Sequence, residues 1–178
     1  MNTRNAIYRK TTAFALALVL LLCATATGSA AFSFRGGVTW DTTVDQMLAA
    51  EGLSEADYNQ KELGGYTFFY LKGKNVYYVY RNVSGTDMLV QAYTVLSAEA
   101  YAAKLETLTA QFGAPADIEA DTIITLMDTI YGSGSVTAGE LTAFTAWRLA
   151  DGTLAALFAT GGAAYMAYFH EQRILNGE

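Results

Sequence analysis

The spacing of apolar residues along the chain changes from helical to alternating and back. A first helix is predicted from Val44, because Thr43 and Gln46 fit the capping box that begins many helices. Gly52 is placed to end it in a left-handed turn. A second helix, capped by Ser97, is predicted from four apolar residues that recur at i, i+4, i+7 and i+11: Tyr101, Leu105, Leu108 and Phe112.

Runs of aromatic and β-branched residues predict two three-stranded meanders, since these residues favour strands and turn sequences separate the runs. The strongest hairpin signal is the Asp151-Gly152 turn of the second meander. The six predicted strands are 66–71, 76–83 and 88–96, followed by 142–150, 153–160 and 163–169.

Three further segments carry weaker patterns. Residues 121–131 combine helical spacing with the β-branched content of a strand, and we favour a helix. Residues 53–63 are polar and poorly periodic, with at most one more helical turn after Ser54. The polar tail from Glu171 is expected to fray.

Two meanders separated by helices predict an α+β fold. We expect an antiparallel sheet of about six strands with two or three helices on one face. Residues 31–178 are long enough to form a single domain with its own core. The βαβ alternation of nucleotide-binding sheets is not found in the sequence.

The first thirty residues have the pattern of a secretory signal peptide. Basic residues come first, and an apolar run from Ala13 to Cys23 follows, shorter than the roughly 20 residues that cross a bilayer. Small residues after it predict cleavage after Ala30 or Ala31, and hence a secreted or extracytoplasmic protein. The alternatives are an uncleaved anchor and a lipoprotein formed at Cys23; leucines directly before Cys23 disfavour lipidation.

Removal of this segment makes the protein more acidic. The chain has 11 Lys and Arg and 17 Asp and Glu, for a net charge of −6. Three basic residues and no acidic ones precede residue 31, so eight basic and 17 acidic residues remain, a net charge of −9. Such a domain repels phosphate backbones and anionic lipid, so nucleic acid is not an expected partner and no stable membrane span is expected after cleavage.

Several stretches of the chain together form a recognisable pattern. They are 34–47, Glu51-Gly52, Tyr101, Leu105, Phe112-Gly113, Pro115, Trp147, Leu149 and 151–153. The pattern resembles small exported bacterial proteins of unknown function and the module shared by the SmpA/BamE-type assembly lipoproteins and the β-lactamase inhibitor proteins. This resemblance implies helices on an antiparallel sheet and protein binding in place of catalysis. Asp41 and Thr42 stand where the pattern has Gly-Met, and the lipidated cysteine of the assembly lipoproteins is missing.

The sequence offers little for catalysis, metal ions or cofactors. His170 is the only histidine, so a catalytic triad that uses a histidine could form only around it. We interpret His170 as an exposed residue at a strand end. Zinc sites need several His or Cys ligands. Asp117, Glu119, Asp121 and Asp128 imitate the spacing of a calcium loop, but its obligatory glycine is replaced by threonine. We expect no catalytic residue, no metal and no cofactor.

Aromatic residues in the first meander are the candidate binding surface. Helices on one face leave the other face of the sheet open, yet rings occupy both faces of these strands, and exposed tyrosines suit contacts with proteins or glycans. An alternative is that one set of rings is core and the other is ordinary cross-strand packing. The candidate residues are Tyr66, Phe68, Tyr70, Tyr77, Tyr78 and Tyr80.

The sequence therefore predicts a non-catalytic exported binding module of the bacterial cell envelope or exterior. Its partner is expected to be a protein or an envelope component, and its oligomeric state is open. The alternative functions are a small extracytoplasmic hydrolase that uses a pair of carboxylates and a structural envelope protein without a discrete ligand.

Overall fold

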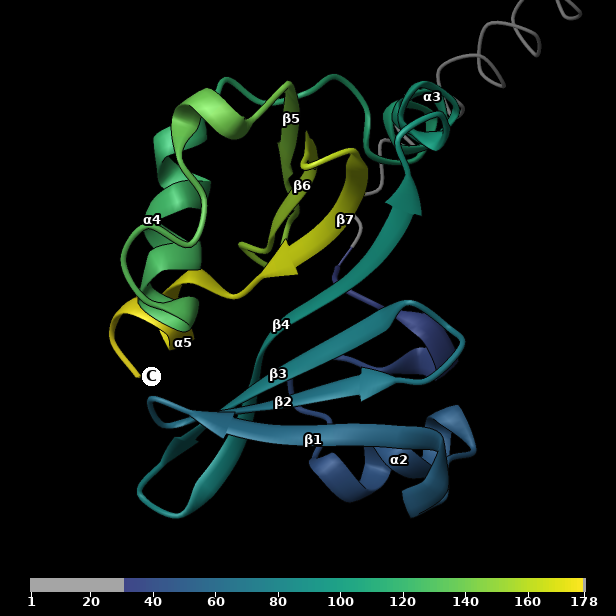
Figure 1. The fold of residues 1–178 in the computed structure, drawn as a ribbon, viewed down its shortest axis with the longest axis vertical. Helices are drawn as coiled ribbons and strands as arrows, with labels where there is room; N and C mark the ends of the chain where they lie inside the picture. The colour runs from purple at the N-terminus through teal and green to yellow at the C-terminus, as the bar shows by residue number, and fades with distance from the viewer. Residues whose placement is uncertain (1–30, 178) are drawn as a thin grey trace, which may run out of the picture.

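The computed structural model of the chain describes residues 31–177, and the predicted signal peptide lies outside this range. The described residues form an α+β fold around one antiparallel sheet in the order β1-β2-β3-β4-β7-β6-β5 (Figure 1). The strands are β1 (Tyr58–Leu63), β2 (Tyr66–Leu71), β3 (Val76–Val83), β4 (Thr86–Ser97), β5 (Ala143–Arg148), β6 (Leu154–Thr160) and β7 (Ala163–Phe169).

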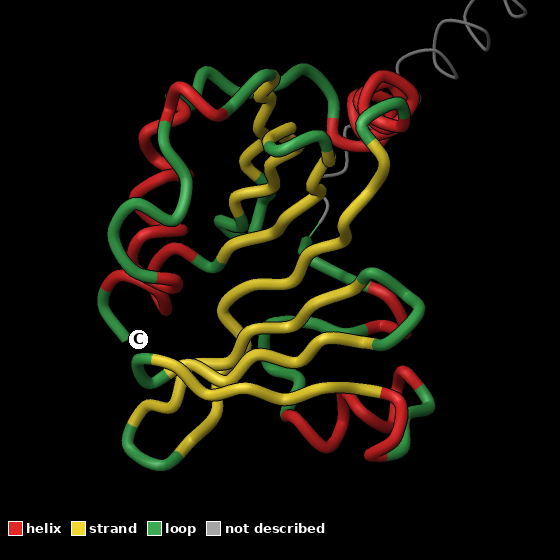
Figure 2. The backbone as a smooth tube through the Cα atoms, viewed as in Figure 1, coloured by secondary structure: helices red, strands yellow, loops and turns green. Residues whose placement is uncertain are grey.

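Helices lie at the outside of the molecule and the strands form its middle (Figure 2). The four α-helices of the described residues are α2 (Val44–Glu51), α3 (Ala100–Phe112), α4 (Ala120–Tyr131) and α5 (Glu171–Leu175). Single 3-10 turns occur at Arg35–Gly37, Glu55–Asp57 and Ala138–Glu140.

Strand β4 joins the two predicted meanders into a single sheet. It pairs with β3 through residues 86–94 and with β7 through residues 91–97. An irregularity at Val79/Tyr80 shifts the register between β3 and β4. Such bulges sharpen the twist of a sheet, and Figure 1 shows the β1–β3 half and the β5–β7 half turned relative to each other.

Helices cover both faces of this sheet, so the prediction of helices on one face is wrong. Met47 of α2 and Leu108 of α3 belong to one core with Leu157 of β6. Leu126 of α4 belongs to the opposite core with Phe158, the next residue of β6. The sequence does contain a signal for helices on both faces: β6 is a continuous apolar run, and such runs are typical of strands buried on both faces.

Two elements were not predicted. Strand β1 occupies residues that are polar and poorly periodic in the sequence. It was missed because five of its six side chains are exposed and it shows no apolar alternation. Helix α5 occupies the tail expected to fray; Ile174 is fully buried there, and Arg81 Nη1 donates to the carbonyl oxygens of Arg173 at 2.7 Å and Ile174 at 2.9 Å.

The beginnings of the three predicted helices follow the sequence with one exception. The capping box of α2 is present in both directions, and Gly52 ends α2 in the left-handed conformation at φ 65°. The N-cap of α3 is Glu99, two residues after the predicted cap Ser97. Residues 120–131 are helical, as favoured.

No helix within residues 31–177 is long and apolar enough to cross a membrane.

Candidate functional site: an aromatic groove on the sheet

A row of aromatic side chains crosses five adjacent strands on the face that α4 partly covers. Strand pairing places Tyr70 opposite Tyr77, Tyr77 opposite Tyr93, and Tyr165 opposite Phe158. Ring centroids in these pairs are 4.8, 4.4 and 5.2 Å apart, with interplanar angles of 30°, 2° and 10°. Neighbouring strands are about 4.8 Å apart, so the stacking distances follow the strand spacing.

The row is interrupted between β4 and β7. Tyr93 lies opposite Ala167, while Tyr165 pairs with Val95, two residues along β4. Tyr93 and Tyr165 are therefore diagonal neighbours, with ring centroids 6.4 Å apart and planes tilted by 47°. The small side chain of Ala167 leaves space beside Tyr93 that a larger residue would fill.

The end of α4 lies beside this interruption. Its last residue, Tyr131, packs against Phe68 with ring centroids 5.3 Å apart and donates from its hydroxyl to Gln91 Oε1 at 2.6 Å. The amide of Gln91 reaches Met127 Sδ at 3.6 Å. Gln91 is one of the few buried polar residues of the protein, and these contacts account for its burial.

Two hollows open along the row. The first, of about 240 Å³, is lined by Tyr93, Ala167, Met127, Tyr165 and Phe158, with Ser135 at its margin. The second, of about 300 Å³, is lined by Phe68, Tyr70 and Tyr77, with polar residues of β1. Tyr93 and Tyr131 line both hollows, so the two adjoin. We call the pair the aromatic groove.

The groove is nearly free of charge. Among the described residues that line it, Lys61 alone is charged. Burial raises the pKa of Tyr131 well above its ordinary value, and neighbouring tyrosines add to the effect; burial also raises the pKa of Tyr93. Both phenols are neutral at physiological pH, so the groove offers hydroxyl and amide hydrogen bonds beside apolar surface.

The structure divides the six predicted surface residues into two sets. Phe68, Tyr70 and Tyr77 are half-buried and line the groove. Tyr78 and Tyr80 were wrongly predicted as surface, because they project to the opposite face of β3 and are fully buried under the N-terminal segment and α2. Tyr66 is also buried, with the Arg81 guanidinium 5.9 Å from its ring centre.

Hydroxyl partners explain how the two buried tyrosines of β3 are accommodated. Tyr78 donates to Glu51 Oε1 at 2.7 Å, and Tyr80 donates to the Thr43 carbonyl oxygen at 3.4 Å. Sequence reasoning missed the groove residues contributed by later elements. The alternation of Tyr165 with Met166 in β7 was a usable signal for two differently packed faces. The missed residues are Gln91, Tyr93, Met127, Tyr131, Phe158, Tyr165 and Ala167.

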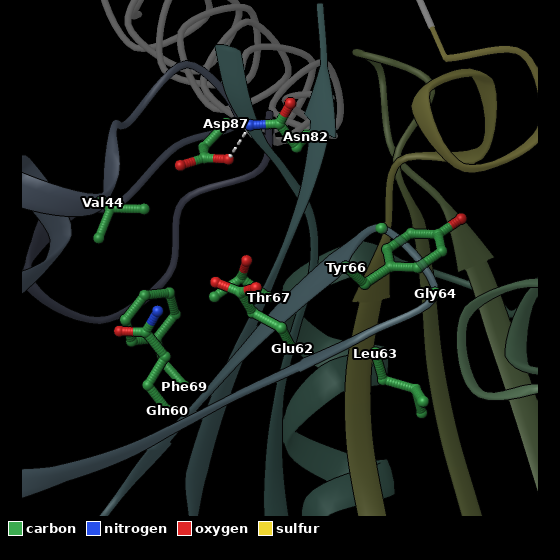
Figure 3. A pocket seen from close by; sticks show the side chains of 11 residues that line it. Val44, Gln60, Glu62, Leu63, Gly64, Tyr66, Thr67, Phe69, Asn82 and Asp87 are labelled. Carbon is green, nitrogen blue, oxygen red and sulfur yellow. Dashed lines mark hydrogen bonds between the residues drawn. The ribbon is translucent and has the colours of Figure 1, made fainter. Parts of the chain in front are cut away.

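A further hollow, separate from the groove and polar, has a volume of about 510 Å³. It lies between the start of α2 and the β1–β2 hairpin. Glu62 of β1 and Asp87 of β4 both line it, as Figure 3 shows. Asp87 is held in the β3–β4 turn: Asn82 Nδ2 donates to its Oδ1 at 2.9 Å, and Gly85 N donates to Asn82 Oδ1 at 3.1 Å. This arrangement gives Asp87 a role in bracing the turn.

The calcium-like acidic segment does not form a cluster. Asp128 Oδ1 instead accepts hydrogen bonds from Gly134 N, Ser135 N and the Ser135 hydroxyl at 3.0–3.1 Å, and so holds the loop at the margin of the groove. Within residues 31–177 no group of three or more His, Cys, Asp and Glu side chains is placed to hold a metal ion.

His170 caps a helix, where the sequence suggested an exposed strand end. It occupies the N-cap of α5, and its Nδ1 accepts from Arg173 N at 3.3 Å. Burial lowers the pKa of His170, and the nearby Arg173 charge lowers it further. The imidazole also meets the Trp40 ring edge-on at 5.3 Å, so it serves the packing of the C-terminal segment.

Comparison with protein families, curated proteins and solved structures gave no match to this chain.

Proposed function

We propose that the protein is an exported binding module that holds an extended polypeptide segment of a partner in the aromatic groove. The observation that supports this proposal is the pair of adjoining hollows along a row of half-buried rings. Tyrosine and methionine are enriched at protein interfaces, because rigid rings and adaptable thioethers give contact area at low entropic cost.

The size of the hollows favours a polypeptide over a cofactor. Small-molecule sites usually measure about 300–1,000 Å³, and the hollows of about 240 and 300 Å³ lie at or below the lower end of that range. Each suits one large side chain. A partner would therefore present two apolar side chains, one to each side of Tyr93 and Tyr131.

Charge restricts the partner further. The chain has a net charge of −6, and removal of the predicted signal segment makes it −9. An acidic segment would be repelled at long range, while a neutral or basic one would be attracted. Lys61 at the margin of the second hollow is a local exception. We therefore expect a partner segment that is apolar and aromatic, with a neutral or positive net charge.

Peptide binding tests this proposal. The probes are synthetic hexapeptides with two aromatic or large aliphatic side chains, in neutral, basic and acidic versions, and binding is measured by NMR shifts of the groove residues. We expect neutral and basic peptides to perturb Tyr93 and Tyr131 first. Cell-wall oligosaccharides are the competing probe; if they bind the groove and none of the peptides does, the polypeptide assignment is wrong.

A matched pair of variants locates the contact. Ser135→Trp puts a bulky ring at the margin of the first hollow, whereas Ser133→Trp alters an exposed residue of the same loop that does not line it. We expect at least a tenfold loss of peptide affinity for Ser135→Trp and none for Ser133→Trp. Equal affinities of the two variants would place binding elsewhere.

Export is the second part of the proposal, and it is supported by the basic start, short apolar run and small residues of the first thirty positions. Fractionation of the producing cells tests it separately. Recovery of the processed protein outside the cytoplasm is the expected result, and its retention in the cytoplasm as the full-length chain would contradict export.

A further inference from the structure

Phe32 is the first buried residue of the part of the chain that the structure describes. Its side chain is only 3% exposed, while its neighbours Ala31 and Ser33 are exposed. The Phe32 ring stacks on Trp40, with centroids 3.9 Å apart and planes within 20°, and it meets Tyr168 at 5.3 Å. Phe32 is thereby fixed against the core, and so is the position of its backbone nitrogen.

That nitrogen faces a carboxylate 119 positions away in the chain. Phe32 N donates to Asp151 Oδ2 at 2.6 Å, and Thr153 N donates to the other carboxylate oxygen at 3.0 Å. Asp151 belongs to the turn between β5 and β6. Thr153 in turn accepts the indole N–H of Trp40 through its hydroxyl at 2.7 Å, so the Phe32–Trp40 stack and the Asp151 carboxylate are held in one arrangement.

Asp151 has no positively charged partner among residues 31–177. Arg148 lines the same small hollow as Asp151 but is engaged in an ion pair with Glu171. Burial alone would raise the pKa of Asp151, but hydrogen bonds from Phe32 N and Thr153 outweigh it and hold that pKa below its ordinary value. The carboxylate is therefore ionised and aimed at the Phe32 nitrogen.

We propose that the chain is cut between Ala31 and Phe32, and that the new α-ammonium group of Phe32 becomes the counter-ion of Asp151. Water adds across the Ala31–Phe32 peptide bond, in a reaction catalysed by a peptidase of the class that removes signal sequences. The Ala31 carbonyl carbon keeps the hydroxyl as a carboxylate, and the Phe32 nitrogen takes up protons to become the ammonium.

The alternative cut, after Ala30, would not create this pair. Ala31 would then carry the ammonium, and Phe32 would keep an ordinary peptide N–H towards Asp151. The sequence alone leaves both cuts open, because Gly28/Ala30 and Ser29/Ala31 both have the required small residues. Selection of Phe32 as the first residue therefore rests on the Asp151 contact. The inference rests on the export part of the proposed function and is independent of peptide binding.

N-terminal sequencing of the exported protein is the first test. We expect a single sequence that starts at Phe32. A start at Ala31 would overturn the inference while leaving export and peptide binding untouched, and a start at Cys23 would indicate a lipoprotein and overturn it as well.

Urea denaturation of defined N-termini tests the ion pair itself. A form that starts at Phe32 should have an unfolding equilibrium constant about tenfold smaller than a form that starts at Ala31, as expected for one charge-assisted hydrogen bond. N-acetylation of the Phe32 form and Asp151→Asn should each remove this difference. If the Phe32 and Ala31 forms have equal stabilities, or if acetylation changes nothing, the pair does not exist.

The pH dependence separates an ion pair from a merely structural contact. The unfolded α-amino group titrates near pH 8, and pairing with Asp151 raises its pKa in the folded protein. As long as Asp151 is ionised, the advantage of the Phe32 form is then complete below about pH 8 and lost as pH rises through the folded pKa of the α-amino group. The charged or titratable groups around Asp151 are Arg148 of β5, Glu171 of α5 and His170 before α5; none of them is altered between the two forms.

Discussion

Glu51 joins three separate parts of the chain through one carboxylate. It accepts hydrogen bonds from Tyr78 of β3 at 2.7 Å, Arg35 of the N-terminal segment at 3.1 Å and Lys74 of the β2–β3 turn at 3.2 Å. Its side chain is 3% exposed. Burial alone would raise the pKa of Glu51, but these donors outweigh that effect and lower it.

Glu51→Gln should therefore destabilise the protein by about 1.5–3 kcal/mol at neutral pH, the range for hydrogen bonds to charged groups. Because the pKa of Glu51 is lower in the folded state, its contribution is complete above the unfolded value near 4.5 and is lost as pH falls through the folded pKa. Urea denaturation should show that the difference in unfolding free energy between the wild type and Glu51→Gln becomes smaller in acid. Glu55→Gln, at an exposed residue, is the control and should have no measurable effect.

The hydrogen bond from the Trp40 indole to Thr153 is buried and 2.7 Å long. Thr153→Val keeps the shape of the side chain but leaves the indole N–H without its acceptor, which costs about 1–3 kcal/mol. Thermal unfolding followed by tryptophan fluorescence measures the loss. Thr160→Val, at the half-buried end of β6, should leave the midpoint nearly unchanged; similar losses for both variants would contradict the assignment.

At the scale of elements, α5 shows how a polar tail becomes part of the core. Ile174 is fully buried while Leu175 beside it is 52% exposed. Ile174→Ala should cost about 2–5 kcal/mol by leaving a cavity, whereas Leu175→Ala should cost well under 1 kcal/mol. Chemical denaturation of the two variants provides a matched comparison. Equal effects would mean that α5 does not dock as described.

The elements predicted from sequence are those with a local signal. Strand β2 was predicted with its observed limits because of its aromatic content, and α2 because of its capping box. Strand β1 was missed, since its polar side chains face solvent and its pairing with β2 is the cause of its structure. Helix α5 was missed because a single apolar residue, Ile174, anchors it.

The candidate site was half predictable for a related reason. The sequence indicated that both faces of β2 and β3 carry rings. It could not indicate that Tyr78 lies under α2 while Tyr77 lies in the groove, because burial depends on which helix covers each face. Tyr131 and Tyr165 reach the groove from elements more than fifty positions along the chain. The pairing of β7 with β4 brings Tyr165 there, and the packing of α4 on the sheet brings Tyr131.

At the scale of the molecule, β4 makes the two halves of the sheet one cooperative unit. The core that contains Phe69 of β2 also contains Trp147 of β5, and the opposite core runs from Val79 to Phe158. We expect backbone amides of β3 and β6 to exchange with hydrogen isotope only through global unfolding, at the same free energy. Amides of β1 should exchange through a separate, less costly opening. Different free energies for β3 and β6 would indicate two independent units.

The position of β1 at the edge of the sheet also bears on how the protein behaves when concentrated. No strand within residues 31–177 pairs with its outer side, so that side offers free backbone donors and acceptors to another chain. Lys61 and Glu62 place opposite charges at the middle of this edge, where apolar residues would invite strand-to-strand assembly. The polar side chains that left β1 without a strand signal in the sequence thus disfavour its pairing with the edge of another molecule.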